Sequence, residues 1–218
     1  MAEIRWFGHA CFRIRAREAT ILTDPVPRSF GYKVEKQRAD IVTVSHGHPG
    51  HTAFDILNGE YQLVDRPGEY EMHDVFITGI QTYHDDERGA QRGKNTVFLI
   101  EAEGLMICHL GDLGHELTDA QAEAMNSVDV LLVPVGGNDV LDGAQASAVV
   151  GQIEPRLVVP MQYQTPFGDA QREGVERFLK EMAAGEIAPI DRLTIRKSEL
   201  AEGAYATSVV VLECGATK

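Results

Sequence analysis

Residues 41–51 read Ile-Val-Thr-Val-Ser-His-Gly-His-Pro-Gly-His, and they are the most informative part of the sequence. A run of four apolar, mostly β-branched residues predicts a buried strand. The strand is followed at once by three histidines within six positions. In an extended turn, His46 and His48 point to the same side, so that two ring nitrogens can reach one metal ion. Such loops at strand ends are where binding sites are usually built.

His51 is predicted to lie at the start of a helix, because Thr52 and Asp55 form a capping pattern directly after the histidines. The partial positive charge of a helix N-terminus disfavours imidazolium, which keeps the ring neutral as a metal ligand must be. It also favours a bound hydroxide or an anionic substrate. The alternative interpretation of this loop is a polar, glycine-rich turn whose histidines merely face water.

Strands dominate the predicted first half of the chain, and helices enter later. Short apolar or alternating runs predict strands at residues 3–7, 10–15, 20–23, 40–45, 62–64, 75–80, 95–102, 105–110, 128–135, 156–161, 192–196 and 208–213. Glu103-Gly104 is a two-residue hairpin signal.

Three later helices are predicted. Apolar stripes at i, i+3, i+4 and i+7 cover residues 146–153 and 175–182. Asp142 and Asp169 are their expected N-caps, and Thr118 with Gln121 opens a shorter helix that runs to Met125. We therefore predict an α/β protein in which two packed sheets carry helices outside, as one domain over residues 1–218.

The composition excludes several classes of function. The 218 residues suffice for a substantial buried core, and 33 acidic against 20 basic residues give a formal charge of −13. This charge repels phosphate backbones, so neither nucleic acid nor a membrane surface is an expected partner. Cys11, Cys108 and Cys214 are too far apart for a thiolate zinc motif and predict free thiols. The first residues carry charges, and no apolar run approaches the about 20 residues that span a bilayer, so we expect a cytoplasmic protein.

Two further polar clusters follow predicted strands. His84 comes after the strand that ends near Ile80, and Asp112 lies in a Gly-Asp loop after the second hairpin strand. A carboxylate at Asp112 could join imidazoles on the same metal. No G-x-S-x-G elbow occurs, and Cys108 and His109 are neighbours on a strand and face opposite sides, so serine and thiol nucleophiles are not expected.

These motifs occur in the order typical of a known family. The chain resembles the metallo-β-lactamase superfamily, most of all its small group of zinc-dependent hydrolases related to ascorbate-6-phosphate lactonase. The resemblance implies a four-layer αββα sandwich and covers nearly the whole chain. The motifs that carry it are Gly8-His9-Ala10, Ile21 to Pro25, Ala39 to His51, Tyr83-His84-Asp85, Gly111-Asp112 and Val159-Pro160-Met161.

The resemblance implies a first metal site made of His46, His48 and His84, with Asp112 as the carboxylate that bridges to a second metal. The second site departs from the family pattern H-x-H-x-D-H. Gly50 stands where the pattern has aspartate, and Gln162 stands where the family has a histidine after Pro-Met. An amide oxygen is a poor substitute for imidazole on zinc.

A single metal ion is therefore expected, zinc first, with iron or manganese as alternatives. Without a second carboxylate at position 50, only Asp112 would offset the four positive charges of two divalent ions. One zinc can still lower the pKa of water toward about 7. Asp112 and His51 are the residues that we expect to act in catalysis. Since the missing aspartate also removes an obvious base, catalysis could be weak, altered or lost.

Other residues have secondary roles in this interpretation. His9 is a candidate to hydrogen-bond a metal ligand or to replace one, and His115 is similar, although each could be structural. His109 is expected to be a buried, hydrogen-bonded ring and His73 a surface residue. We assign the amide of Gln162 to substrate binding. The loop after His84 carries cationic side chains that could receive an anionic group, or could simply be solvated: Arg88, Arg92 and Lys94.

Two functions follow from these observations. The first is a metal-dependent hydrolase that uses one metal to activate water against an ester, lactone or phosphate-bearing small molecule. The second is a non-catalytic descendant of the fold that binds a metabolite or protein partner through the cleft that holds the active site in the family. Gly50 and Gln162, which depart from the family's metal-binding pattern, are the reason for considering it. The first function predicts close to one equivalent of metal, lost on His48→Ala.

Overall fold

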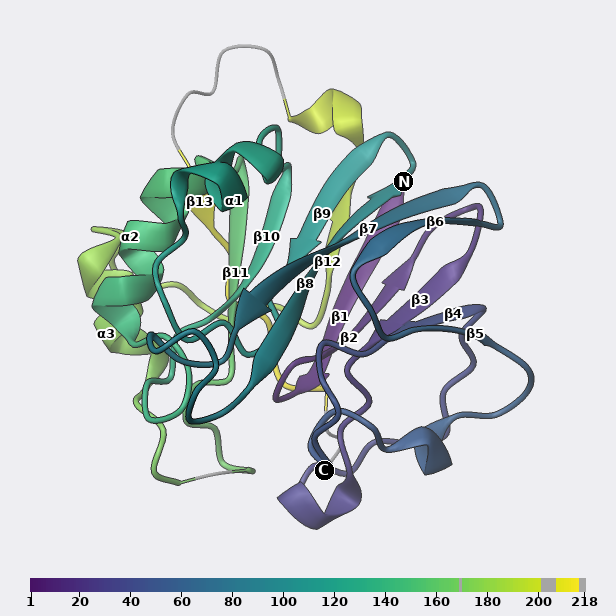
Figure 1. The fold of residues 1–218 in the computed structure, drawn as a ribbon, viewed down its shortest axis with the longest axis horizontal. Coiled ribbons are helices and arrows are strands. Elements are labelled where there is room, and N and C mark those ends of the chain that lie inside the picture. Colours follow the sequence, from purple (N-terminus) through teal and green to yellow (C-terminus); the bar gives the residue numbers. More distant parts are fainter. Residues whose placement is uncertain (169, 201–206, 216–218) are drawn as a thin grey trace.

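Two mixed β-sheets lie face to face in the computed structural model, which describes residues 1–168, 170–200 and 207–215 (Figure 1). The first sheet has the order β12-β1-β2-β3-β4-β5. Its strands are β1 (Ala2–Gly8), β2 (Cys11–Arg15), β3 (Thr20–Thr23), β4 (Ile41–Thr43), β5 (Gln62–Val64) and β12 (Leu193–Ile195).

The second sheet has the order β13-β11-β10-β9-β8-β7-β6. Its strands are β6 (Gly68–Met72), β7 (Val75–Tyr83), β8 (Lys94–Ala102), β9 (Leu105–His109), β10 (Val130–Pro134), β11 (Leu157–Met161) and β13 (Ser208–Val209). Strand β10 is buried along its whole length, as expected for a central strand with both faces covered.

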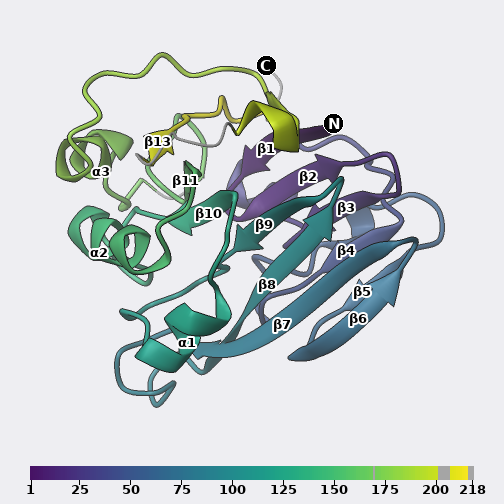
Figure 2. The same cartoon turned by 90° about the horizontal axis from the view of Figure 1, so that it is seen from above.

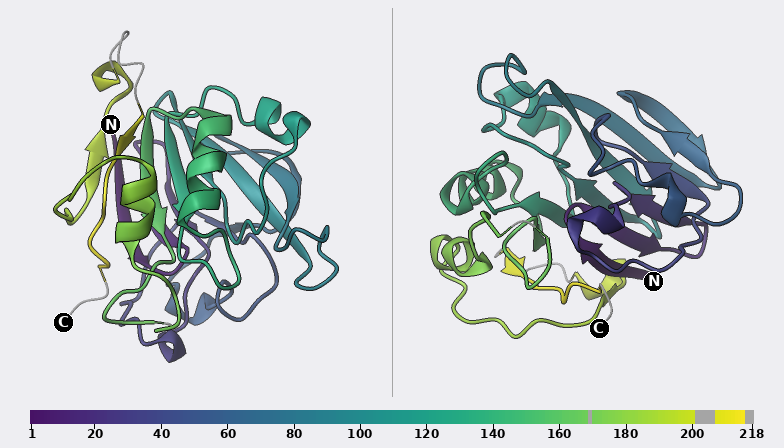
Figure 3. Two further views of the ribbon diagram at one scale, coloured as in Figure 1. Left: turned by 90° about the vertical axis from the view of Figure 1, so that its left-hand side faces the viewer. Right: turned by 90° about the horizontal axis from the view of Figure 1, so that it is seen from below.

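Helices cover the outer face of the second sheet. Figure 2 shows α2 (Gly143–Ile153) and α3 (Val175–Glu181) side by side against β10 and β11, and Figure 3 shows the same layer from two further sides. The short α1 (Asp119–Ala124) packs beside α2. Among the described residues the longest helix, α2, has eleven residues, well short of the about 20 needed to cross a bilayer.

The outer face of the first sheet is covered differently. Alternate residues of β1 to β4 face opposite ways, so that Trp6 and Phe12 enter the core between the sheets while Phe7 and Leu22 face outward. The outward side chains pack under residues 26–39 and 53–57. This covering segment holds only the two 3₁₀ turns η1 (Arg28–Phe30) and η2 (Phe54–Ile56). A further turn, η3 (Lys197–Glu199), follows β12.

The predicted fold class is confirmed, and several local predictions are confirmed with it. The loop Glu103-Gly104 is a tight hairpin turn with positive φ at both residues. Thr118 and Asp142 each form a capping box, with Gln121 and Gln145 respectively. Cys11 and Cys108 are buried free thiols.

Other local predictions are wrong. No helix starts at Thr52, whose hydroxyl instead donates to the carbonyl of His48; only the three-residue turn η2 follows, so His51 does not lie at a helix N-terminus. Strand β6 is missed, because its Gly-Glu-Tyr-Glu-Met sequence is that of a largely exposed edge strand. The last strand is two residues long instead of six. Helix α3 begins after Gly174, and the predicted cap Asp169 lies outside the described residues.

The core between the sheets gives a direct test of the fold. Phe98 on β8 is fully buried, whereas Phe76 on the neighbouring β7 is 51% exposed. Phe98→Ala is expected to lower the free energy of unfolding by about 3–5 kcal/mol, because it leaves a cavity. Phe76→Ala, the matched control, should change it by less than about 0.5 kcal/mol. Urea unfolding measures both, and equal effects would contradict this packing.

Candidate metal centre

One edge of the sandwich gathers the polar residues of the site, because each of them follows the end of a strand. These residues are His9 after β1, Asp24 after β3, His46, His48 and His51 after β4, His84 after β7, Asp112 after β9 and Gln162 after β11. Loops far apart in the sequence thus meet at one place, as strand ends in layered folds commonly do.

Three of these residues form a group that faces a cavity, here called the cavity-facing group: His46, His84 and Asp112. Their potential ligand atoms all lie within 4.8 Å of one another. Asp112 Oδ2 is 3.0 Å from His84 Nε2 and 3.8 Å from His46 Nε2. Two imidazole nitrogens and one carboxylate oxygen are the donor set of many three-ligand zinc sites.

The ring of His46 is oriented for metal binding by its neighbour. The hydroxyl of Ser45 donates to Asp24 Oδ2 at 2.7 Å, and it also lies 3.0 Å from His46 Nδ1. Because its single proton goes to the carboxylate, the hydroxyl accepts from Nδ1–H of His46. The lone pair of His46 is then on Nε2, the atom that faces Asp112. A hydrogen bond that fixes the tautomer of a ligating histidine is common at metal sites.

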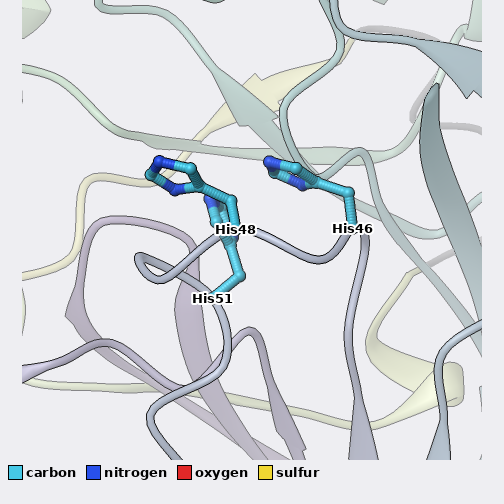
Figure 4. A group of neighbouring side chains, drawn as sticks. All are labelled: His46, His48 and His51. Atoms are coloured by element: carbon cyan, nitrogen blue, oxygen red, sulfur yellow. The ribbon is translucent and has the colours of Figure 1, made fainter. Parts of the chain in front are cut away.

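His48 is placed differently from the other predicted ligands. Its side chain is exposed, and it forms a second candidate group with His46 and His51. Figure 4 shows that these three side chains point to the same side of the loop after β4. The Nδ1 of His48 accepts from the backbone N–H of Gly50 at 3.1 Å, which leaves the proton of the neutral ring on Nε2. Nε2 of His48 can serve as a ligand only after its proton moves to Nδ1 and the hydrogen bond from Gly50 is lost.

A third set of residues, here called the buried group, comprises His9, His51 and Asp112. His51 Nε2 lies 3.2 Å from His9 Nε2 and 3.1 Å from Asp112 Oδ2, and its Nδ1 lies 2.9 Å from Asp24 Oδ2. His51 and Asp24 have no exposed surface. The structure thus brings the predicted secondary residue His9 into direct contact with the histidine loop.

Charge around these groups separates the pKa values of the histidines. Burial lowers the pKa of His46 to about 4 and that of His9 well below its usual value. Burial opposes the charged form of His51 too, but the carboxylates of Asp112 and Asp24 outweigh it and raise the pKa of His51 to about 10. The expectation of a neutral His51 is therefore wrong for the metal-free protein, because two carboxylates, and no helix N-terminus, face its ring.

Asp112 is held in place on several sides. Its Oδ1 accepts from Gln162 Nε2 at 2.7 Å, and its backbone N–H donates to Asn95 Oδ1 at 2.9 Å. Asn95 itself donates to Thr82 Oγ1 and to the carbonyl of Leu110. Burial opposes ionisation, but contact with His51 and His84 holds the pKa of Asp112 well below its usual range. Asp112 is therefore a fixed, ionised carboxylate.

The backbone is strained at three of these positions. His9, Asp24 and Gln162 have φ values of 51°, 39° and 56°, in the left-handed region that non-glycine residues seldom adopt. Such strain costs about 1–3 kcal/mol per residue and collects at functional sites. Gly111, with φ of 58°, has no room for a side chain, since a Cβ there would lie 2.5 Å from Asn95 Oδ1.

Gly50 lies close against a neighbouring aromatic ring. A Cβ at this position would lie 2.9 Å from the ring of Phe30. That ring stands edge-on to His9, with centroids 5.4 Å apart. In this chain Phe30 therefore occupies the space in which a side chain at position 50 would begin, and the same ring packs against His9.

A cavity of about 800 Å³ opens above the cavity-facing group. This volume is typical of small-molecule sites. It is lined by His9, Ser29, Phe30, Tyr32, His46, Gly47, His48, His84, Arg92, Lys94, Asp112, Asp139, Gly168 and Arg172. The buried Arg172 pairs with Asp139 at 2.8 Å and donates to the carbonyl of Gln162.

Asp85 shapes the cationic side of this cavity. Its carboxylate accepts from four backbone N–H groups of the loop that follows, those of Glu87, Gly89, Gln91 and Arg92. Burial opposes the ionised form, but these donors outweigh it and lower the pKa of Asp85. The loop then places Arg92 and Lys94 along the cavity. Arg88, the third predicted cation, is exposed and is not among the lining residues.

The remaining three histidines lie outside all of these groups. His115 accepts from the backbone N–H of Tyr83 and packs against the Tyr83 ring, so its contacts are with the loop and not with the predicted ligands. His109 is fully buried and contacts the carbonyl of Ala10 at 3.0 Å, as predicted for a satisfied ring. His73 is exposed, as predicted.

Sequence reasoning missed four residues that build the site: Asp24, Asp85, Asn95 and Arg172. Asp24 had a usable signal, since Thr-Asp-Pro directly follows a buried strand, much as the histidines follow β4. Asp85 had one too, because a short acidic side chain opens a glycine-containing loop. Asn95 and Arg172 had none, because their partners come from distant strands.

The comparisons with known proteins agree with this geometry. A model of the β-lactamase superfamily domain matches residues 3–162, well over half of the chain. The chain belongs to the metallo-β-lactamase superfamily. A UPF0173 protein of Pyrococcus abyssi is 30% identical over 195 residues, which cover 82% of this chain and 90% of that protein. This superfamily member therefore belongs to the UPF0173 family.

Further relatives carry functional names. A UPF0173 metal-dependent hydrolase of Thermoplasma acidophilum is 31% identical over 205 residues, covering 81% of this chain and 88% of that one. A crystal structure of a candidate zinc-dependent hydrolase of the metallo-β-lactamase superfamily from Thermotoga maritima has a TM-score of 0.79 at 36% identity, covering 97% and 98% of the two chains. Both names are those of metal-dependent hydrolases.

Asp24 provides a test of how the centre is oriented. It contacts His51 directly and His46 through Ser45, so Asp24→Asn should weaken zinc affinity by roughly 10–100-fold. The control is Asp129→Asn, which removes another buried carboxylate, one that pairs with Lys197. Zinc titration against a chelating indicator measures both. Equal zinc affinity in the two variants would show that Asp24 does not orient the ligands.

Proposed function

We propose that this chain is a metal-dependent hydrolase that cleaves an anionic small molecule carrying an ester, lactone or phosphate group. The observation that carries the proposal is the cavity-facing group, in which His46, His84 and Asp112 meet at the floor of a cavity of ligand size. The names of the similar proteins from Thermoplasma acidophilum and Thermotoga maritima support it. So does the resemblance to relatives of ascorbate-6-phosphate lactonase.

The residues present fit a divalent cation. The donor set suits zinc, with iron or manganese as alternatives, since imidazole and carboxylate accept all three. Nε2 of His46 is free to bind, because its other nitrogen donates to Ser45. His46, His84 and Asp112 would hold this cation, and His48 would join them only with a change of tautomer that frees its Nε2. When bound, the cation supplies a Lewis acid that lowers the pKa of water and polarises the group under attack.

The protein residues orient and charge the reacting groups. Gln162 and Asn95 fix Asp112, whose low pKa keeps it ionised at neutral pH, as a metal ligand must be. His51 is fully buried and is not among the cavity-lining residues. It would therefore act on a substrate only through Asp112, as a positioning residue. Asp112 remains the predicted catalytic carboxylate.

Charge indicates the class of substrate. The chain has a formal charge of −13, yet Arg92 and Lys94 line one side of this cavity; the third cation there, Arg172, is paired with Asp139. Cationic side chains along a cavity of an acidic protein attract small anions and give them charge-assisted hydrogen bonds. Nucleic acid and membranes do not fit this arrangement, since the rest of the surface repels them. We therefore propose a small anionic substrate.

The alternative function is a non-catalytic protein that binds a metabolite or protein partner through this cavity, here called the binding module. One observation favours it. Gln162 donates to Asp112 Oδ1 where the family pattern has a histidine, so this atom of the carboxylate is engaged within the protein. The alternative predicts normal folding and ligand binding without hydrolysis.

Removing one ligand separates the two functions. His84→Ala should lower hydrolysis by at least about 100-fold and reduce bound zinc, because its Nε2 is 3.0 Å from Asp112. His73→Ala removes an exposed histidine and should change neither. Zinc-loaded protein would be assayed with p-nitrophenyl esters, with p-nitrophenyl phosphodiesters and with lactones. Hydrolysis that persists in His84→Ala would contradict the proposal, and no hydrolysis by the parent would favour the binding module.

The substrate class is tested by the loop cations. Replacing Arg92 and Lys94 together by alanine should raise KM for an anionic substrate roughly tenfold with little change in kcat, since these groups bind and do not react. Arg88→Ala, which alters the same loop outside the cavity, is the control. An unchanged KM in the double variant would rule out anion recognition by this loop.

A further inference from the structure

The buried group has the dimensions of a cation site. In a tetrahedral zinc site with bonds of about 2.0–2.1 Å, neighbouring ligand atoms lie about 3.3–3.4 Å apart. His9 Nε2 and His51 Nε2 are 3.2 Å apart, and His51 Nε2 and Asp112 Oδ2 are 3.1 Å apart. All three atoms fall within 4.8 Å of one another. The cavity-facing group shares only Asp112 with this set.

The outer contacts of His51 support the same interpretation. Asp24 Oδ2 lies 2.9 Å from His51 Nδ1 and favours a proton on that nitrogen, so that when a cation displaces the other proton of the imidazolium, the lone pair is on Nε2. Asp24 is itself fixed by the N–H and the hydroxyl of Ser45, each at 2.7 Å. A carboxylate, a histidine and a cation in line are a recurrent arrangement at metal sites. Asp24 also contributes a buried negative charge next to the ring.

A buried amide oxygen lies near this group without a partner. Gln162 has no exposed surface, and its Oε1 finds no hydrogen-bond partner among the described residues. Its Nε2 contacts Asp112 Oδ1 at 2.7 Å and both ring nitrogens of His9 at 3.4 Å. An unpaired buried oxygen is costly. The amide nitrogen, and not this oxygen, faces His9 and Asp112, so the oxygen would reach a cation there only if the amide turned over.

Local packing explains why His9 takes part. Gly50 leaves room for Phe30, whose ring contacts His9 edge-on. The strained backbone of His9, with φ of 51°, directs its ring to His51. The histidine loop therefore lacks a carboxylate at position 50 and gains an imidazole from the turn between β1 and β2.

We propose that His9, His51 and Asp112 form a second divalent-cation site, in which His9 supplies the ligand that position 50 lacks. The two sites would share Asp112, so this inference rests on the proposed function. The charge objection to two cations is weakened, because Asp24 adds a second buried carboxylate in contact with His51. The sequence-based expectation of one metal counted Asp112 alone.

Metal stoichiometry tests the second site without an activity assay. Chelator-stripped protein is dialysed against micromolar zinc, and bound zinc is measured by mass spectrometry. The parent should hold about two equivalents and His9→Ala about one. His9→Asn is a second variant, because asparagine tolerates the left-handed backbone and its shorter side chain does not reach the position of Nε2. His73→Ala is the matched control, since His73 is exposed and has φ of 52°.

The outcomes distinguish this inference from the proposed function. One equivalent in the parent and in both His9 variants would overturn the second site and leave the proposed function standing. Two equivalents in the His9 variants would overturn the assignment of His9. One equivalent in the parent and none in the His9 variants would support the His9 site and contradict the cavity-facing group. Urea unfolding of each variant confirms that the loss of zinc does not follow from loss of the fold.

Discussion

The contact between the Asp112 carboxylate and the histidines around it is the interaction on which the site depends. Asp112 is 2% exposed and is reached by His51 and His84 through the same oxygen, at 3.1 and 3.0 Å. A buried, ionised carboxylate is unfavourable unless positive charge or several donors face it. In the metal-free protein, protonated His51 and the amide donor of Gln162 meet this requirement. A divalent cation would meet it with a larger charge, which is why the same geometry favours metal binding.

The fold makes this contact possible by bringing the ends of distant strands together. His84 follows β7 and Asp112 follows β9 in one sheet, while Asp24 and His46 follow adjacent strands of the other. The two sheets pack over one apolar core, so the loops at this edge are held by rigid elements on both sides. His9, Asp24 and Gln162 adopt unfavourable left-handed backbone conformations, and these conformations place their side chains in the site.

Much of the fold was predictable from the sequence, because period-2 patterns and capping pairs act locally. The hairpin at Glu103-Gly104 and the capping box at Asp142 are examples. The gathering of His46, His84 and Asp112 was predictable only through the order of strand-end motifs. The helix predicted at Thr52 does not form, and the threonine hydroxyl donates to the preceding carbonyl of His48 instead of capping a helix. The pairing of His9 with His51 was not predictable, since it depends on how Phe30 packs beside Gly50.

Anomalous diffraction at the zinc edge, from crystals of the parent protein equilibrated with zinc, shows directly whether these residues hold a cation. We expect an anomalous peak at the floor of the cavity, about 2.0–2.2 Å from Nε2 of His46, Nε2 of His84 and a carboxylate oxygen of Asp112. Well-ordered crystals in which zinc occupies other positions, while these three side chains remain in contact with one another and without metal, would contradict it.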